Sequence, residues 1–183
     1  MTTRRSGKEG IITAKPQETT VASSVGFGPV AREDARILIL GSLPGQRSLQ
    51  AGQYYAHPQN AFWKIMQDLT DASGTYEQRC DVLCEHRIAL WDVLATSVRP
   101  GSMDADIAMD TAKANDFNEF FMRHSEIERV CFNGQKAGRM FERLVVLDEA
   151  AGPRQFETLP STSPAYASMT YAAKLAKWRD AIK

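Results

Sequence analysis

Apolar positions along the chain follow two patterns, short continuous runs and longer stretches with helical spacing. Continuous apolar runs bounded by turn residues are typical of strands that are buried on both faces of a parallel sheet. Strands are therefore predicted at residues 36–40, 88–94 and 129–133, and residues 155–159 are expected to form a fourth. Apolar residues spaced three and four apart predict amphipathic helices that alternate with these strands. Helices are expected at residues 62–69, 76–86, 117–121, 137–144 and 171–182.

This alternation of strands and helices predicts the fold class. A strand followed by a helix and a parallel strand places the helices on the two faces of one sheet. We therefore expect an α/β fold, a three-layer α/β/α sandwich with a central four-stranded parallel sheet. Ligands of such sheets bind beyond the carboxyl ends of the strands. Loops rich in Gly, Pro or Asn follow three of the predicted strands, at residues 41–45, 133–134 and 160–164.

The N-terminal 31 residues show neither pattern. They are rich in Thr, Ser and Gly, and up to residue 20 they carry four basic and two acidic side chains. A segment of this composition buries too little apolar surface to fold alone. We expect residues 1–31 to form a flexible arm, which either contacts phosphate groups or is only solvated, and residues 32–183 to form one domain.

The charge balance narrows the classes of function. The 22 Lys and Arg residues equal the 22 Asp and Glu residues, which excludes nucleic-acid binding through bulk charge but not through a local basic groove. No apolar run approaches the roughly 18 residues of a membrane span, and the first residues lack the apolar core of a secretory signal. Cys80, Cys84 and Cys131 lack zinc-site spacing, so we expect reduced thiols in a cytoplasmic protein with no metal or cofactor.

A segment before the first predicted helix carries candidate chemistry. Residues 54–63 combine four aromatic residues, the last of which is Trp63, with a His, an Asn and a Pro. Asn60 is placed to cap the helix, and Phe62 suits either a core or a stacking surface. Asn133 follows a strand, where its amide either forms a turn or meets a donor and an acceptor of a ligand.

Two loops at the predicted sheet edge have distinct compositions. Residues 41–45, Gly-Ser-Leu-Pro-Gly, form a tight turn but match neither the GxxxxGK[ST] phosphate loop nor GxGxxG. Residues 160–164 place three hydroxyl side chains between two prolines, which suits phosphate contacts or an ordinary loop capped by Ser163. An esterase that uses Ser42 or Ser163 is disfavoured because the chain has no G-x-S-x-G elbow.

Together these motifs resemble the uracil-DNA glycosylase superfamily from about residue 36 to 182. Residues 41–45 are similar to its first motif and residues 160–164 to its second. Residues 60–63, Asn-Ala-Phe-Trp, are similar to the Asn-x-Phe-Trp of the mismatch-specific enzymes. The run of the first motif into Tyr-Tyr, His-Pro and Asn-x-Phe-Trp is most similar to the hypoxanthine-DNA glycosylases, also called DNA-deoxyinosine glycosylases, as are residues 90–93 and 99–102.

The resemblance implies a base excision repair enzyme whose catalytic domain is residues 32–183. Such an enzyme flips a deaminated base, uracil or hypoxanthine, out of single- or double-stranded DNA and hydrolyses its N-glycosidic bond. We expect a monomer that associates with the nucleoid when it acts on DNA. The sequence leaves the choice between uracil and hypoxanthine open, because the volume of the pocket is not visible in it.

The resemblance also suggests roles for individual residues. Phe62 would stack on the flipped base, and Asn133 would read its edge. Asn60 would position the attacking water, with His57 as an alternative donor or base. The expected substrate contacts are Ser42, Leu43, Pro44, Gly45, Tyr55, Phe62 and Asn133. The expected DNA contacts are Ser161, Thr162, Ser163, Pro164 and Tyr166, the last of which either fills the hole left by the base or packs on the final helix.

Two positions depart from the superfamily pattern. Leu43 occupies the place where the mismatch-specific enzymes carry a water-positioning Asn, and Leu159 the place where other members carry a His that stabilises the departing base. The absence of these Asn and His side chains leaves a second interpretation open, in which the protein is non-catalytic or weakly catalytic and binds lesions or abasic sites. No Lys lies in the motifs to form a Schiff base, so an active protein is expected to be monofunctional and to leave an abasic site.

Overall fold

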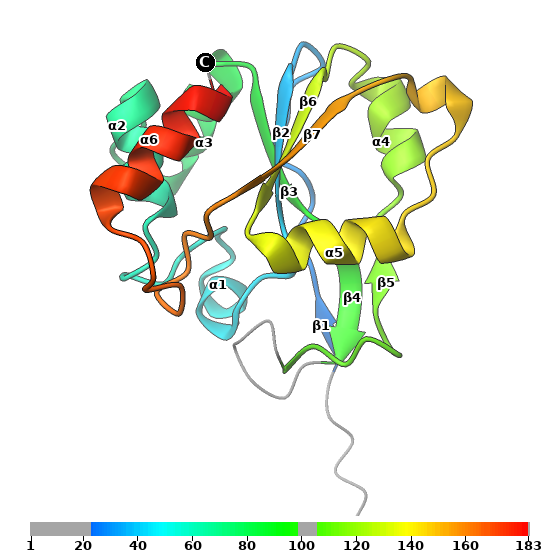
Figure 1. Ribbon diagram of the computed structural model, residues 1–183, viewed down its shortest axis with the longest axis horizontal. Helices are drawn as coiled ribbons and strands as arrows, with labels where there is room; N and C mark the ends of the chain where they lie inside the picture. The colour runs from blue at the N-terminus through cyan, green and yellow to red at the C-terminus, as the bar shows by residue number, and fades with distance from the viewer. Residues whose placement is uncertain (1–22, 99–105, 183) are drawn as a thin grey trace, which may run out of the picture.

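A four-stranded parallel sheet forms the centre of the protein. The computed structural model describes residues 23–98 and 106–182 (Figure 1). The central strands lie in the order β3-β2-β6-β7, and every neighbouring pair is parallel. Their bounds are β2 Ile37–Gly41, β3 Ile88–Asp92, β6 Arg129–Asn133 and β7 Gln155–Leu159. The predicted four-stranded parallel sheet is confirmed, with strand bounds that shift by a residue at β2.

Helices cover both faces of this sheet, which confirms the three-layer α/β/α sandwich (Figure 1). One face carries α2 (Phe62–Thr70), α3 (Tyr76–Glu85) and α6 (Tyr171–Ile182). The other face carries α4 (Phe117–Arg123) and α5 (Gln135–Leu144). The short helix α1 (Gln46–Ala51), which the apolar pattern did not predict, follows β2 at the carboxyl edge of the sheet. No helix in the described part of the chain is long and apolar enough to cross a membrane.

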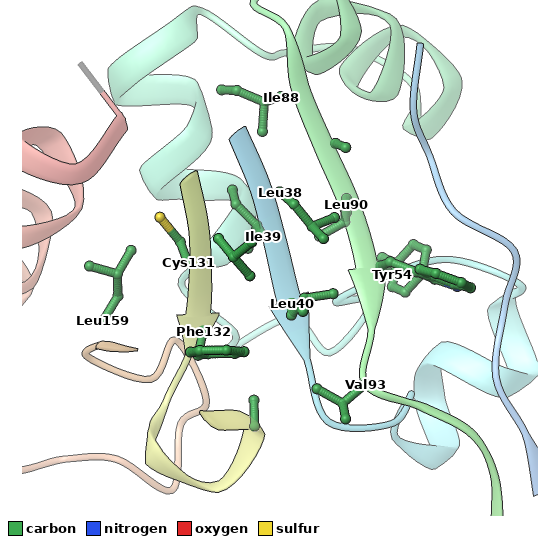
Figure 2. Packing of buried hydrophobic residues seen from close by; sticks show 14 of the residues in the cluster. Leu38, Ile39, Leu40, Tyr54, Ile88, Leu90, Val93, Cys131, Phe132 and Leu159 are labelled. Carbon is green, nitrogen blue, oxygen red and sulfur yellow. The ribbon is translucent and has the colours of Figure 1, made fainter. Parts of the chain in front are cut away.

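The core lies on both sides of the central strand β2. Leu38, Ile39 and Leu40 are fully buried, and Figure 2 shows their side chains among those of the neighbouring strands β3 and β6. Alternate residues of a strand point to opposite faces, so a run with every residue buried requires cover on both faces. The continuous apolar runs therefore predicted these strands correctly.

A second, smaller sheet lies beside the carboxyl edge of the first, and the apolar pattern missed it. Its antiparallel strands lie in the order β1-β4-β5, with bounds Ser23–Val25, Leu94–Val98 and Lys113–Ala114. The chain passes from β3 directly into β4, because Val93 breaks the predicted strand of residues 88–94. The Val93 N–H donates to the carbonyl of Gly41, and the Val93 carbonyl accepts from the N–H of Asn115.

Residues 23–30, here called the N-terminal strap, pack on the domain instead of belonging to a free arm. The Phe27 carbonyl accepts hydrogen bonds from the Tyr54 hydroxyl at 3.3 Å and from the Trp91 indole N–H at 3.0 Å. Val30 and Leu90 pair backbone to backbone. The part of the chain that packs on the domain therefore begins before residue 31, because the strap is held by distant partners that no local pattern shows. The rest of the expected arm, residues 1–22, lies outside the described residues.

Candidate active site at the carboxyl edge of the sheet

A cavity of about 480 Å³ opens at the carboxyl ends of the parallel strands. Residues 41–45 and residues 161–165 both line it. The wall is completed by residues from other parts of the chain: Gln46, Arg47, Ser48, Tyr54, Tyr55, His57, Asn60, Asp92, Asn133 and Tyr166. The two loops singled out by the sequence thus meet at one site, although more than a hundred residues separate them.

A buried carboxylate lies beside the first loop. Gly41 at the end of β2 pairs in register with Asp92 at the end of β3, and Asp92 is only 3% exposed. A methyl group on Gly41 would lie 2.2 Å from Asp92 Oδ1 and 2.9 Å from the Tyr55 hydroxyl. Only glycine therefore allows this carboxylate and this hydroxyl to approach the strand end.

The aromatic face of the cavity belongs to Tyr55, not to Phe62. Phe62 is 0% exposed and does not line the cavity. Its ring is covered by that of Tyr55, with centroids 4.1 Å apart and an interplanar angle of 26°. Tyr55 adopts a φ of +55°, a left-handed conformation that is costly for a residue with a side chain. The expected stacking role of Phe62 is not met in this structure, because Phe62 supports the ring that faces the cavity.

Tyr54 anchors this segment to the rest of the domain. Its hydroxyl donates to carbonyls of the N-terminal strap, and its own carbonyl accepts from the Trp63 indole N–H at 2.8 Å. Burial, and next the nearby Asp92 carboxylate, raise the pKa of the Tyr54 hydroxyl. Tyr54 therefore stays neutral and structural, while its neighbour Tyr55 forms the cavity wall.

Asn60 lines the cavity just before α2. The helix cap is Ala61 and not Asn60 as expected, although Asn60 Oδ1 accepts from the Phe62 N–H at 3.0 Å. This bond turns the amide oxygen toward the helix and leaves the amide N–H₂ group as a donor for the cavity. The backbone N–H of Asn60 donates to the His57 carbonyl at 2.8 Å, so the two candidate catalytic residues belong to one turn.

His57 also lines the cavity and is half-buried. Its Nδ1 accepts from the N–H of Gln59 at 3.2 Å. A neutral imidazole that accepts at Nδ1 carries its hydrogen at Nε2, so the ring has one donor left. His57 therefore suits donation to a developing anion better than abstraction of a proton in this arrangement.

Asn133 is tied to the second loop. Its amide N–H₂ donates to the Thr162 hydroxyl at 2.8 Å, and its Oδ1 accepts from the Thr162 backbone N–H at 2.8 Å. Asn133 is 9% exposed and Thr162 is 1% exposed, so these bonds are shielded from water. The structure places Asn133 at the cavity as expected, but both functional groups of its amide already have protein partners.

The remaining hydroxyls of the second loop, those of Ser161 and Ser163, are half-buried. The Ser161 hydroxyl accepts from the N–H of Ser163, and the Ser163 hydroxyl accepts from the N–H of Ala165. A hydroxyl oxygen that accepts from its own loop keeps its hydrogen free to donate. Pro164 and Tyr166 are exposed beside them, and the Lys174 ammonium lies 5.2 Å from the Tyr166 ring centroid.

Asp92 is the site residue that sequence reasoning missed. A signal for it existed, because a charged residue ends an apolar run that pairs with the strand before the first motif. The residues of the first loop, Ser42, Leu43, Pro44 and Gly45, lie on the cavity as expected, and Leu159 is buried outside its lining. Among the described residues, no group of three or more His, Cys, Asp or Glu side chains is placed to hold a metal ion.

Comparison with known proteins agrees with this geometry. A sequence profile of the uracil DNA glycosylase superfamily matches residues 27–183, which span both cavity loops. The chain belongs to the uracil DNA glycosylase superfamily. Members of this superfamily are hydrolases that act on N-glycosyl bonds, so the protein is a DNA glycosylase with DNA as its substrate. The match begins within the N-terminal strap, in agreement with the packing of that segment.

Individual relatives of the superfamily cover most of the domain. A hypoxanthine DNA glycosylase from Methanosarcina acetivorans is 39% identical over 118 residues, which are 62% of this chain and 72% of that protein. A hypoxanthine DNA glycosylase from Methanosarcina barkeri is 38% identical over 119 residues, with the same coverage. The solution NMR structure of a Methanosarcina acetivorans protein assigned as a uracil DNA glycosylase superposes with a TM-score of 0.73 at 32% identity. It covers 88% of this chain and 97% of its own.

Proposed function

We propose that the protein removes a deaminated purine, hypoxanthine, from DNA, with uracil as a weaker substrate. The observation that carries the proposal is one cavity that joins both superfamily loops to a tyrosine ring and a buried carboxylate. The names of two relatives, each about two-fifths identical, support the purine assignment. The cavity volume of about 480 Å³ leaves room for a two-ring base.

Base recognition in this proposal rests on Asp92. Deamination converts a ring nitrogen of adenine or cytosine from an acceptor into an N–H donor, at N1 of hypoxanthine or N3 of uracil. An ionised carboxylate is only an acceptor, so it bonds to this N–H and repels the unprotonated nitrogen of the normal base. Asp92 would therefore read the product of deamination itself. A correctly paired guanine also carries this N–H, and it is excluded by the cost of extruding it from the stack.

Bond cleavage leaves positive charge on the sugar and negative charge on the departing base. The amide of Asn60 and the Nε2–H of His57 are the donors of one turn that face the cavity, and donors near the base stabilise its developing charge. Water then adds to the anomeric carbon in place of the broken bond to the base, and the proton it loses neutralises the base anion, so the products are the free base and an abasic deoxyribose. No lysine is among the described residues that line the cavity, which supports a monofunctional reaction.

DNA binding by a chain with no net charge requires local donors. The hydroxyls of Ser161 and Ser163 and the exposed guanidinium of Arg47 lie on the cavity rim, where flanking phosphates would pass. Such contacts hold the backbone without reading sequence. Binding should accordingly weaken as salt concentration rises, because phosphate contacts release counterions.

The test is a panel of matched oligonucleotides that contain hypoxanthine, uracil, adenine or an abasic-site analogue, each as single and double strands. We expect abasic product from hypoxanthine faster than from uracil, and none from adenine. Tight binding to the abasic analogue with no product from any base would identify a lesion-binding protein instead. The replacement of usual polar catalysts by Leu43 and Leu159 is the observation that favours this second candidate.

A further inference from the structure

We infer that Asn133 is a positioning residue, which acts on Asn60 through Thr162 and does not contact the base. This inference rests on the proposed function, because it concerns how the glycosylase site is held in shape. It replaces the edge-reading role that the sequence suggests for Asn133.

The first link joins β6 to the second loop. Asn133 ends β6, and its amide makes two hydrogen bonds of 2.8 Å to Thr162, one to the hydroxyl and one to the backbone N–H. Two bonds to one residue fix both the position and the rotation of that residue. The next position, Gly134, packs so closely that a methyl group there would lie 2.9 Å from Cβ of Ser161. The second loop is therefore held against the end of β6 over two successive residues.

The second link joins the loop to Asn60. The Thr162 carbonyl accepts from the N–H of Ala61 at 2.9 Å. That N–H belongs to the peptide group that joins Asn60 to Ala61, so its anchoring limits rotation about the Cα–C bond of Asn60. The other side of Asn60 is held as well, because its own N–H bonds to the His57 carbonyl. Thr162 thus connects Asn133 to the turn that carries Asn60.

The two roles of Asn133 differ in their chemistry. To read a base edge, the amide has only its second N–H and the second lone pair of its oxygen left, and its two bonds to Thr162 already fix its orientation. To hold Thr162, the amide needs only the geometry already present. A displacement of about 1 Å in a catalytic group can reduce a rate by about 10²-fold, so loss of this support should reach the chemistry.

A double-mutant cycle tests the inference. Single-turnover excision of hypoxanthine is measured for the parent, Asn133→Leu, Asn60→Ser and the double variant, with thermal melts and abasic-DNA binding in parallel. We expect Asn133→Leu to slow excision by about 10²-fold in the parent and by less than about 3-fold in the Asn60→Ser background, because residues that act as a unit are not additive. The rate ratio of hypoxanthine to uracil should stay unchanged.

Variants of Thr162 provide the matched control. Thr162→Val removes only the hydroxyl that Asn133 bonds, and Thr162→Ser retains it. Slower excision by Thr162→Val, with recovery in Thr162→Ser and unchanged binding to abasic DNA, supports the inference even where Asn133→Leu fails to fold. Effects of Asn133 and Asn60 that multiply independently would overturn it, as would a changed base preference in Asn133→Leu. Absence of abasic product from the parent chain would instead contradict the proposed function.

Discussion

Neighbouring residues in this site have different roles, structural for some and functional for others, which their residue types alone do not reveal. Tyr54 and Tyr55 are adjacent and chemically alike, yet one bonds the N-terminal strap and the other forms the cavity wall. Phe62 could belong to either group, and its complete burial assigns it to the core. The decisive variable is the direction of each side chain, which the left-handed conformation at Tyr55 sets locally.

Removal of the Asp92 charge should change which bases are excised. We expect Asp92→Asn to slow hypoxanthine excision by about 10- to 100-fold, since a hydrogen bond to a charged group is lost. The new amide can also donate to N1 of adenine, so the preference for hypoxanthine over adenine should narrow. Single-turnover rates on the two bases measure both effects. Asp68→Asn on α2, outside the cavity lining, serves as the control, and an unchanged preference in Asp92→Asn would remove Asp92 from base recognition.

Truncation of Phe62 should affect mainly the stability of the protein rather than catalysis itself. Phe62→Ala leaves a cavity in a fully buried position and should cost about 3–5 kcal/mol of unfolding free energy. Tyr55→Leu keeps the core ring, so it should leave stability closer to the parent while weakening retention of the flipped base. Denaturant titrations beside excision assays separate the two. A Phe62→Ala protein of parental stability would contradict the core assignment.

At the scale of elements, apolar periodicity predicted the parts that are long and covered on both faces. Strands β2, β3 and β6 and helix α2 each contain enough apolar positions to define a pattern, whereas β7 is mostly exposed and carries only two apolar residues. Strands β1 and β5 span three and two residues, too short for any pattern, and they exist because β4 lies between them. The sequence likewise did not show that Asp92 lies beside Gly41 or that Asn133 bonds Thr162. Contacts between residues so far apart in the chain are fixed only when the sheet forms.

Two truncations should separate the N-terminal strap from the residues before it. Deletion of residues 1–22 should leave the melting temperature nearly unchanged, whereas deletion of residues 1–30 should lower it, because the Tyr54 hydroxyl and the Trp91 indole lose their acceptors. Phe27→Ala in the full chain is the matched variant, since it retains the accepting carbonyl and removes only the ring that packs on Tyr54. Equal melting temperatures for both deletions would show that the strap adds no stability.

For the molecule as a whole, the site is a product of topology rather than of local sequence. The central sheet brings the ends of β2, β3 and β6 to one edge, and the loop after β7 closes the cavity from the far side. Family resemblance located the two loops, and the fold explains why they meet. The neutral charge of the chain is compatible with the proposed DNA contacts, because Arg47, Ser161 and Ser163 all line the cavity at that edge.

Stability of the whole domain should decline in alkaline solution. Burial raises the pKa of the Cys131 thiol to about 12, and burial also raises the pKa of Tyr54. In the unfolded chain these groups titrate near about 8.5 and 10, so their contribution is complete below about pH 8.5 and is lost as pH rises toward 12. Urea midpoints measured from pH 7 to 10.5 should fall, and less steeply in Cys131→Ala. A flat profile would contradict the burial of these groups.

The position of β7 at the edge of the sheet has a consequence for DNA binding. Four of its five residues are exposed, and it pairs with β6 alone in the central sheet. Edge strands open more readily than central ones, so β7 should exchange its amide hydrogens with solvent faster than β2. The second loop follows β7 directly, so DNA bound in the proposed way would hold the strand closed by mass action. Abasic DNA should therefore slow amide exchange in β7 more than in β2. Amide exchange at this edge would then report DNA binding without any base excision.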